Sequence, residues 1–345
     1  MAAILDDFGN LVVLDSNGTP IGPRRSLIGI FDEFPCDFPE LLGGVFPTLL
    51  LKGRAPRIVG IDVRSGVPRW SRQTLLTGVY DILVSGHAAV TLEGETIQAF
   101  DLQSGEVYWA FDLGDYSGDS GTPHFFRGLE DEVVVSTETQ WTTLELHRGS
   151  VLRHLPSFCN IQVVEYGIGY CSSGSAGASQ VSAFDITTGT QLWRKPLEIA
   201  FLKLIACAGS LWVLGSRTRD GPEEQPVVEL VRLNAFSGEE LDSTLGKHRD
   251  EGVMLCAPSM MVYGAFRELS GDSRFVAGLG TMPSQSWRIP APPIGPRFGW
   301  IGFPASANIA LADIDRIIGL DSRTGSVSWD FAITSSISPR SPPRQ

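Results

Sequence analysis

One short pattern recurs along the chain and limits what the chain can fold into. It consists of a run of small and apolar residues, an Asp, a turn that closes on Gly, and a Trp four residues after that Gly. The clearest copies are IVGIDVRSGVPRW, IQAFDLQSGEVYW, VSAFDITTGTQLW and IIGLDSRTGSVSW, which end at Trp70, Trp109, Trp193 and Trp329. Recurrence at intervals of this kind indicates repeated supersecondary units, as in propellers and solenoids.

The spacing of the turn glycines predicts the number of units. Successive glycines are 39, 44, 40, 49 and 87 residues apart at Gly66, Gly105, Gly149, Gly189, Gly238 and Gly325. The last gap is double the others and contains a degenerate copy, FVAGLGTMPSQSW, with Pro283 at the glycine position and Trp287 at the Trp position. Another weak copy, LVVLDSNGTPIG, places a turn at Gly18. We therefore expect eight units of about 43 residues.

Each position of the pattern has a physical role. The Asp can accept hydrogen bonds from turn amides, and the Gly supplies the positive φ that a hairpin turn requires. A small residue two positions before the Asp leaves room for an aromatic ring, and a Trp buries roughly 150–250 Å². A copy near each end of the chain suits a closed ring, because a solenoid does not need one.

The pattern resembles the tryptophan-docking motif of the pyrroloquinoline-quinone-type (PQQ-like) β-propellers. The resemblance implies an all-β fold, an eight-bladed β-propeller (alternatively seven-bladed) of four-stranded antiparallel blades. It implies one domain over residues 1–337, followed by a tail at 338–345 that we expect to be disordered. The first unit has no Trp, and two others depart from the motif with Glu145 and Arg153, and with Asn234 and Asp242, at the Asp and Trp positions.

The unit around Gly105 predicts how the strands of one blade follow one another. We expect an inner strand over Gly78–Val84, a second over His87–Leu92, a third over Thr96–Leu102 and an outer strand over Glu106–Leu113. In propellers, the connections from outer strand to next inner strand lie on the same face as those between second and third strands. These connections ring the mouth of the channel.

Composition limits the possible partners. The formal net charge is −12 and no basic stripe is present, which argues against nucleic-acid binding, since that binding depends on phosphate neutralisation. No segment reaches the roughly 20 apolar residues of a membrane span. The start of the sequence, MAAILDDFGN, has no basic region and no signal-length apolar run. The five cysteines show no paired spacing, which predicts reduced thiols in a cytoplasmic protein.

Two histidines are candidate catalytic residues. The strand pattern places His124 and His248 at the channel mouth, where Asp250 and Glu251 could assist them. A histidine in this position could act as a general base if a substrate proton came within hydrogen-bond reach. The alternative interpretation is that all four are ordinary polar loop residues.

Candidate ligand-binding residues also fall near the mouth connections. Arginines there suit a carboxylate or phosphate, and the aromatic residues could line the channel or pack between blades; the set is Arg72, Tyr116, Arg249, Arg297 and Trp300. Tyr116 lies among acidic residues whose spacing does not match a calcium loop, so no metal site is predicted.

These residues and the resemblance leave three functional classes. The first is a non-redox propeller that binds a small ligand or a protein at the channel mouth. The second is a cytoplasmic enzyme of cyclase, lyase or isomerase type that uses the histidine and acid groups. The third, a quinone-dependent dehydrogenase, is disfavoured: the quinoproteins that this chain resembles carry adjacent cysteines and a calcium set, and no two cysteines adjoin here. No cofactor is therefore expected.

Overall fold

The computed structural model describes most of the chain, and the residues that it describes are built from β-strands. They are residues 2–5, 10–15, 17–21, 25–26, 40–45, 48–52, 57–62, 64–74, 79–93, 96–113, 124–127, 131–137, 140–156, 159, 161–175, 178–217, 227–241, 247–248, 255–257, 261–267, 274–280, 286–290, 299–302, 308–312, 316–321 and 323–332. No helix occurs among them, and hence none that could cross a membrane.

The described strands pair into eight antiparallel sheets. In chain order the strands are β1 (Ala2–Leu5), β2 (Asn10–Leu14) and β3 (Arg25–Ser26); β4 (Glu40–Val45), β5 (Thr48–Lys52), β6 (Arg57–Asp62) and β7 (Pro68–Gln73); β8 (Val79–Ser85), β9 (Ala88–Glu93), β10 (Thr96–Asp101) and β11 (Val107–Asp112); β12 (His124–Arg127), β13 (Glu132–Ser136), β14 (Gln140–Glu145) and β15 (Val151–Pro156); β16 (Val163–Glu165), β17 (Ile168–Ser175), β18 (Ala178–Asp185) and β19 (Gln191–Leu197); β20 (Ala200–Cys207), β21 (Ser210–Arg217), β22 (Val227–Asn234), β23 (Glu240–Leu241) and β24 (Lys247–His248); β25 (Leu255–Ala257), β26 (Met261–Arg267), β27 (Arg274–Leu279) and β28 (Trp287–Pro290); and β29 (Gly299–Gly302), β30 (Asn308–Ala312), β31 (Arg316–Asp321) and β32 (Val327–Ala332).

The chain forms two compact units. The smaller comprises residues 1–2, 14–20 and 252–345, and the larger comprises residues 3–13 and 21–251. The expectation of one domain over 1–337 stays a prediction, and the tail at 338–345 lies outside the described residues.

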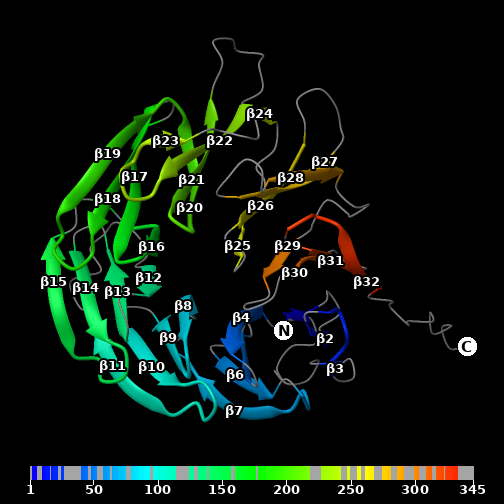
Figure 1. The fold of residues 1–345 in the computed structure, drawn as a ribbon. Helices are drawn as coiled ribbons and strands as arrows, with labels where there is room; N and C mark the ends of the chain where they lie inside the picture. The colour runs from blue at the N-terminus through cyan, green and yellow to red at the C-terminus, as the bar shows by residue number, and fades with distance from the viewer. Residues whose placement is uncertain are drawn as a thin grey trace, which may run out of the picture. The chain divides into compact units, whose positions relative to one another are not determined.

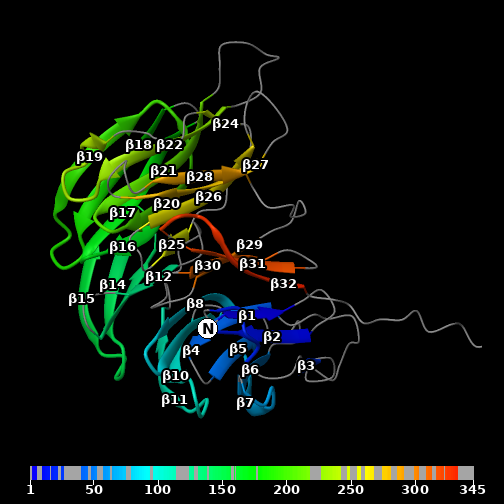
Figure 2. The ribbon, with the colours of Figure 1, turned by 45° about the vertical axis from the view of Figure 1, so that its right-hand side comes forward.

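In the larger unit, consecutive four-stranded sheets follow one another in chain order (Figures 1 and 2). Their first strands, β4, β8, β12, β16 and β20, contact one another in succession, so the first strand of each sheet is its innermost. Apolar side chains fill the space between neighbouring sheets. Val90 and Ala99 of one sheet, for example, pack in the same cluster as Val133 and Leu144 of the next.

The predicted strand pattern is confirmed in the unit around Gly105. The structure has β8, β9, β10 and β11 where the sequence predicts four strands, with ends that differ by at most one residue. Hydrogen bonding follows the order β8–β9–β10–β11, so each strand pairs with its neighbour in sequence. Short reversals suffice to connect antiparallel neighbours in this order, which is why glycines recur at the turns.

Candidate functional site

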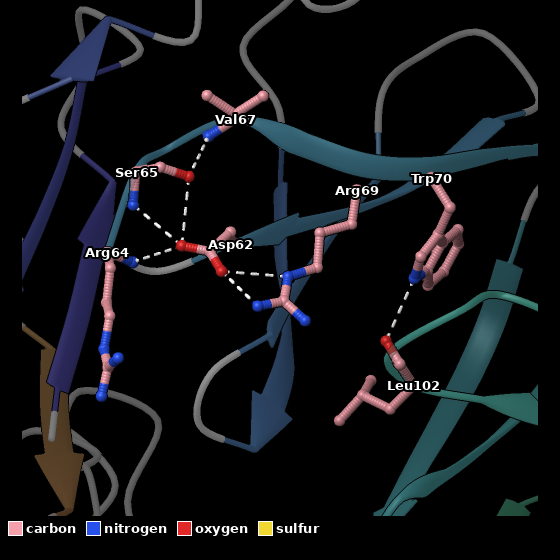
Figure 3. A network of polar contacts seen from close by, with 7 residues as sticks. All are labelled: Asp62, Arg64, Ser65, Val67, Arg69, Trp70 and Leu102. Carbon is pink, nitrogen blue, oxygen red and sulfur yellow. Dashed lines mark hydrogen bonds and ion pairs between the residues drawn. The ribbon is translucent and has the colours of Figure 1, made fainter.

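The Asp of the repeated pattern organises the turn between the third and fourth strands of a sheet. Asp62 Oδ1 accepts hydrogen bonds from the backbone N–H groups of Arg64 (2.9 Å) and Ser65 (2.8 Å), and its Oδ2 pairs with the Arg69 guanidinium (Figure 3). The turn closes where Gly66 N donates to Asp62 O at 2.7 Å, with Gly66 at φ 67°. This confirms the predicted roles of the Asp and the Gly.

These contacts lower the pKa of two turn carboxyl groups. The Arg69 guanidinium, the Ser65 N–H and the Ser65 hydroxyl together hold the pKa of Asp62 at about 2. At Asp101, burial raises the pKa, but hydrogen bonds from Ser104 and the Tyr108 hydroxyl outweigh it and the net shift is downward. Both carboxylates therefore serve to hold a turn rather than to exchange protons near neutral pH.

The Trp of each pattern packs on the turn of the next sheet. Trp70 Nε1 donates to Leu102 O at 3.1 Å, and its ring covers Gly105 so closely that a Cβ there would overlap the indole (Figure 3). Gly60, the small residue opposite Trp70 in its own sheet, leaves room for the same ring. The small residue therefore makes space for the Trp of its own sheet. The face of that Trp ring packs against the turn Gly of the following sheet.

The same docking arrangement recurs in both units. In the larger unit, Trp109 covers Gly149 and donates to Leu146 O at 2.8 Å, and Trp193 covers Gly238 and donates to Ala235 O at 2.9 Å. In the smaller unit, the ring of Trp287 covers Gly325, and the ring of Trp329 covers Gly18. Each of the five tryptophans thus lies against the turn glycine of another sheet.

The predicted catalytic residues are only partly described. His124 is the first residue of innermost strand β12, where its backbone pairs with Ser136. His248 lies on β24, which pairs with β22 opposite Val228 and so continues the outer edge of another sheet. The two backbones lie at opposite edges of different sheets, while Asp250 and Glu251 fall outside the described residues.

Of the predicted ligand-binding residues, only Arg72 has a described side chain. Its Nη2 lies 2.5 Å from Oε1 of Glu93 in the next sheet, and its guanidinium lies 4.3 Å from the Phe100 ring centroid. Burial lowers the pKa of Arg72, and the Glu93 carboxylate opposes this shift. Trp300 lies on β29, and three residues fall outside the described part of the chain: Tyr116, Arg249 and Arg297.

A tight turn that the repeated pattern did not indicate presents an exposed aromatic residue. Strands β16 and β17 are joined by Tyr166 and Gly167, with φ values of 51° and 74°. Positive φ at both central positions is typical of a type I′ turn, which favours Asn-Gly. A bulky residue with φ near this value is uncommon and strained. The Tyr166 side chain is nevertheless 65% exposed.

Tyr166 stacks on a second exposed aromatic residue from the neighbouring sheet. Its ring centroid lies 6.2 Å from that of Phe236, with an angle of 23° between the planes. Phe236, 56% exposed, follows β22 in the Asn234 turn and also lies over Gly209 in the turn between β20 and β21. We call the surface formed by Tyr166 and Phe236 the aromatic patch.

The half-buried carboxyl group of Glu165 accepts hydrogen bonds from the turn next to the aromatic patch. Glu165 Oε1 accepts a hydrogen bond of 2.9 Å from Ala208 N, and Gly209 N also donates to the carboxyl group. Ala208 has φ 53°, so Glu165 stabilises a second turn of the same strained type. Burial raises the pKa of Glu165, and the two N–H groups partly oppose that shift. The carboxyl group thus links the two neighbouring sheets that carry Tyr166 and Phe236.

A weaker aromatic pair occurs at another junction of the larger unit. The Tyr108 ring meets His147 edge-on, with centroids 6.0 Å apart. The Tyr108 hydroxyl donates to Asp101 at 2.8 Å, and burial together with this carboxylate raises the Tyr108 pKa to about 12. This tyrosine is therefore held as a neutral donor within its own sheet.

Two further observations bear on the predicted chemistry. Among the described residues, no group of three or more His, Cys, Asp or Glu side chains could hold a metal ion. The prediction of reduced cysteines is wrong for four of the five, because Cys159 and Cys171 form a disulfide and Cys207 and Cys256 are disulfide-bonded as well. Disulfides persist mainly in oxidising compartments, and the cytoplasmic location stays a prediction.

The sequence matches neither a protein-family model nor a curated protein. Several solved structures nevertheless match its fold. The crystal structure of BamB from Moraxella catarrhalis matches with a TM-score of 0.54 and 18% identity, covering 98% of this chain and 92% of that chain. Dihydro-heme d1 dehydrogenase NirN in complex with DHE matches with a TM-score of 0.64 and 13% identity, covering 96% and 72%. The WD40 domain of Neurospora crassa Pan2 matches with a TM-score of 0.53 and 13% identity, covering 80% and 85%.

The chain folds as a β-propeller. Its all-β content and four-stranded antiparallel sheets confirm those parts of the fold prediction. At identities this low the likeness concerns the fold alone, because one fold supports many unrelated functions. The function must therefore be argued from the residues of this chain.

Proposed function

We propose that this protein is a non-redox β-propeller of the PQQ-like type, with eight blades, that binds a protein partner. The recurring Asp, Gly and Trp contacts support the PQQ-like assignment. The packing of Trp329 on Gly18 supports a ring in which the last blade docks on the first. A repeated rigid sheet with variable turns is suited to recognition.

The observation that carries the proposal is the strained and exposed Tyr166. Backbone strain persists where the surrounding structure enforces it, and it occurs preferentially at functional sites. Asn would fit this turn better than Tyr, so the phenol ring is retained at a cost to stability. Stacked on Phe236, it presents two large rings that form a small exposed apolar surface.

The shape of this surface favours a protein over a small molecule. Small-ligand sites are concave and enclose most of the ligand, whereas the aromatic patch stands on two turns with both rings more than half exposed. Aromatic residues are enriched among the energetically important contacts of protein interfaces. We therefore place the partner at the aromatic patch, in addition to the mouth loops that the sequence indicates.

The enzyme alternative has less support. It requires His124 and His248 to face a common substrate, yet their backbones lie at opposite edges of different sheets. The described groups with shifted pKa values also hold structural contacts: Asp62 and Asp101 order turns, and Arg72 and Glu165 join neighbouring sheets.

Site-specific photo-crosslinking in the native host tests the proposed function. A photoreactive phenylalanine analogue at position 236 should give a discrete protein adduct, whereas the same analogue at exposed Leu192 should not. The Tyr166→Asn change should reduce the adduct at least tenfold, and Ala208→Asn, a matched change in the adjacent I′ turn, should leave it intact. Equal adducts from positions 236 and 192, or no adduct from position 236, would refute binding at the aromatic patch.

A further inference from the structure

The junction between the sheets of β12–β15 and β16–β19 lacks the docking Trp. The sheet of β12–β15 has Arg153 where the sheets before and after it have Trp109 and Trp193, although it keeps the strand bulge, between Thr143 and Leu144, that accompanies the Trp in those sheets. Arg153 instead pairs with Glu132 of its own sheet. The junction with the sheet of β16–β19 must therefore be held in another way.

The turn of the following sheet closes on Gly189, and no indole lies against this glycine. A Cβ built on Gly189 would lie 3.6 Å from Leu155 Cδ1, an ordinary contact. At Gly149, which receives Trp109, the corresponding distance to Trp109 Cγ is 2.6 Å. Gly189 keeps the positive φ of the motif, 72°, without an indole pressed against it.

Trp141 makes one of the contacts that the docking Trp70 makes with the sheet that follows it. It is 1% exposed, and its ring meets Phe184 edge-on with centroids 5.3 Å apart and planes at 78°. This reproduces the contact of Trp70 with Phe100, at 5.6 Å and 80°. Phe184 and Phe100 both directly precede the turn Asp of the receiving sheet, so the two indoles reach equivalent targets from different strands.

The indole N–H of Trp141 connects this contact to a disulfide. Trp141 Nε1 donates to Cys159 O at 3.1 Å rather than to a turn carbonyl. Cys159 follows β15 and is bonded to Cys171 in β17, which is 2% exposed. The covalent bond thus fastens the end of one sheet to the second strand of the next, within one apolar cluster that contains Trp141 and Phe184.

We infer that Trp141 and the Cys159–Cys171 disulfide together replace the docking Trp, so that the redox state of this cysteine pair controls the stability of this junction. A disulfide stabilises a fold mainly by restricting the unfolded chain, and here it closes a loop that joins two neighbouring sheets. Reduction by a dithiol breaks the S–S bond and forms two protein thiols. The reagent supplies two electrons and two protons and becomes a cyclic disulfide. Cys159 is partly exposed whereas Cys171 is buried, so the reducing thiolate would approach from the Cys159 side.

Amide hydrogen exchange with and without dithiothreitol tests this inference. Because dithiothreitol would also reduce the disulfide bonds of Cys207 and Cys256, the measurement is made on the full chain and repeated in a Cys207→Ser, Cys256→Ser background. On reduction, amides of β15 and β17 should exchange on the order of 100-fold faster. Amides of β9 and β10, whose sheet is joined to its neighbours by Trp70 and Trp109, should change less than about threefold. Unchanged exchange in β15 and β17, or equal acceleration in all four strands, would overturn the inference. Alkylation of both cysteines in the untreated native protein would also overturn it.

A restoring variant provides the matched control. Thr143→Ala with Arg153→Trp rebuilds the small residue and the indole of the missing motif. In this variant, reduction should accelerate exchange in β15 and β17 less than about tenfold, because the new ring would cover Gly189. If the restoring variant is as sensitive to reduction as the wild type, the disulfide does not stand in for the docking Trp. Binding at the aromatic patch is not used in either measurement, so the two proposals fail independently.

Discussion

Trp141 meets Phe184 of the following sheet edge-on, as Trp70 meets Phe100, although the two indoles belong to different strands of their sheets. These two junctions therefore do not need the indole on the same strand. Both have an indole ring against the Phe that precedes the turn Asp, and a backbone carbonyl that accepts a hydrogen bond from the indole N–H. The comparison leads to predictions that distinguish junctions with a docking Trp from the Trp141 junction.

The first prediction compares two glycines with nearly the same φ. Gly149→Ala should lower the free energy of unfolding by about 2–4 kcal/mol, because the methyl group meets the Trp109 ring as well as positive-φ strain. Gly189→Ala should lower it by only about 1–2 kcal/mol, from the strain alone. Urea unfolding of both variants checks this. Equal losses would show that the indole contact adds nothing to the requirement for Gly.

The second prediction concerns acid stability. The folded-state pKa of Asp62 is about 2, below its ordinary value of 3.8. Its ionised form therefore stabilises the fold above about pH 4, and this contribution is lost as the pH falls through about 2. Asp62→Asn keeps an acceptor for the turn N–H groups but loses the Arg69 pair. The melting temperature of the variant should lie below that of the wild type near neutral pH, and the difference should shrink at about pH 2.

The third prediction separates a structural from a ligand-binding role for Arg72. Arg72→Met should lower the free energy of unfolding by about 3–5 kcal/mol, because it removes the Arg72 cation from the Glu93 carboxylate, which is 2% exposed. Adding Glu93→Gln should recover at least half of that loss. Thermal unfolding of the single and double variants checks this, and a single variant as stable as the wild type would restore Arg72 as a candidate ligand-binding residue.

The fourth prediction concerns the strained turn. Tyr166→Asn should leave the free energy of unfolding unchanged or raise it by up to about 1 kcal/mol, because relief of the positive φ offsets the lost stack on Phe236. In a Phe236→Ser background, where no stack exists, the same change should be clearly stabilising. Chemical unfolding of the four combinations measures both effects, and a loss in the Phe236→Ser background would mean that the turn is not strained.

The regular parts of the fold could be predicted because they follow from local chemistry. The Asp, Gly and Trp of each pattern act within or next to one turn, so their spacing alone indicated the strands and the docking tryptophans. Tyr166 could not be found in this way, because the two-residue hairpin signals are Asn-Gly, Asp-Gly and Gly-Gly rather than Tyr-Gly. The glycines of the repeated pattern also belong to a different turn.

The parts that could not be predicted depend on contacts between distant residues. Nothing in the spacing of the five cysteines indicates that Cys159 is bonded to Cys171, or that Trp141 donates a hydrogen bond to Cys159. Arg72 looked like a ligand-binding residue near the mouth, yet its partner Glu93 belongs to another sheet. Burial of a long cation depends on how two sheets pack, and the local pattern contains no information on that packing.

The contact of Trp329 with Gly18 has a consequence for synthesis of the protein. Every other docking Trp described above is made before the turn that receives it, so each sheet can be fastened as soon as its successor emerges from the ribosome. At Gly18 the order is reversed, because this turn is translated long before Trp329, the indole that covers it. The Gly18 turn therefore remains without its indole until all the sheets between these two residues have been translated.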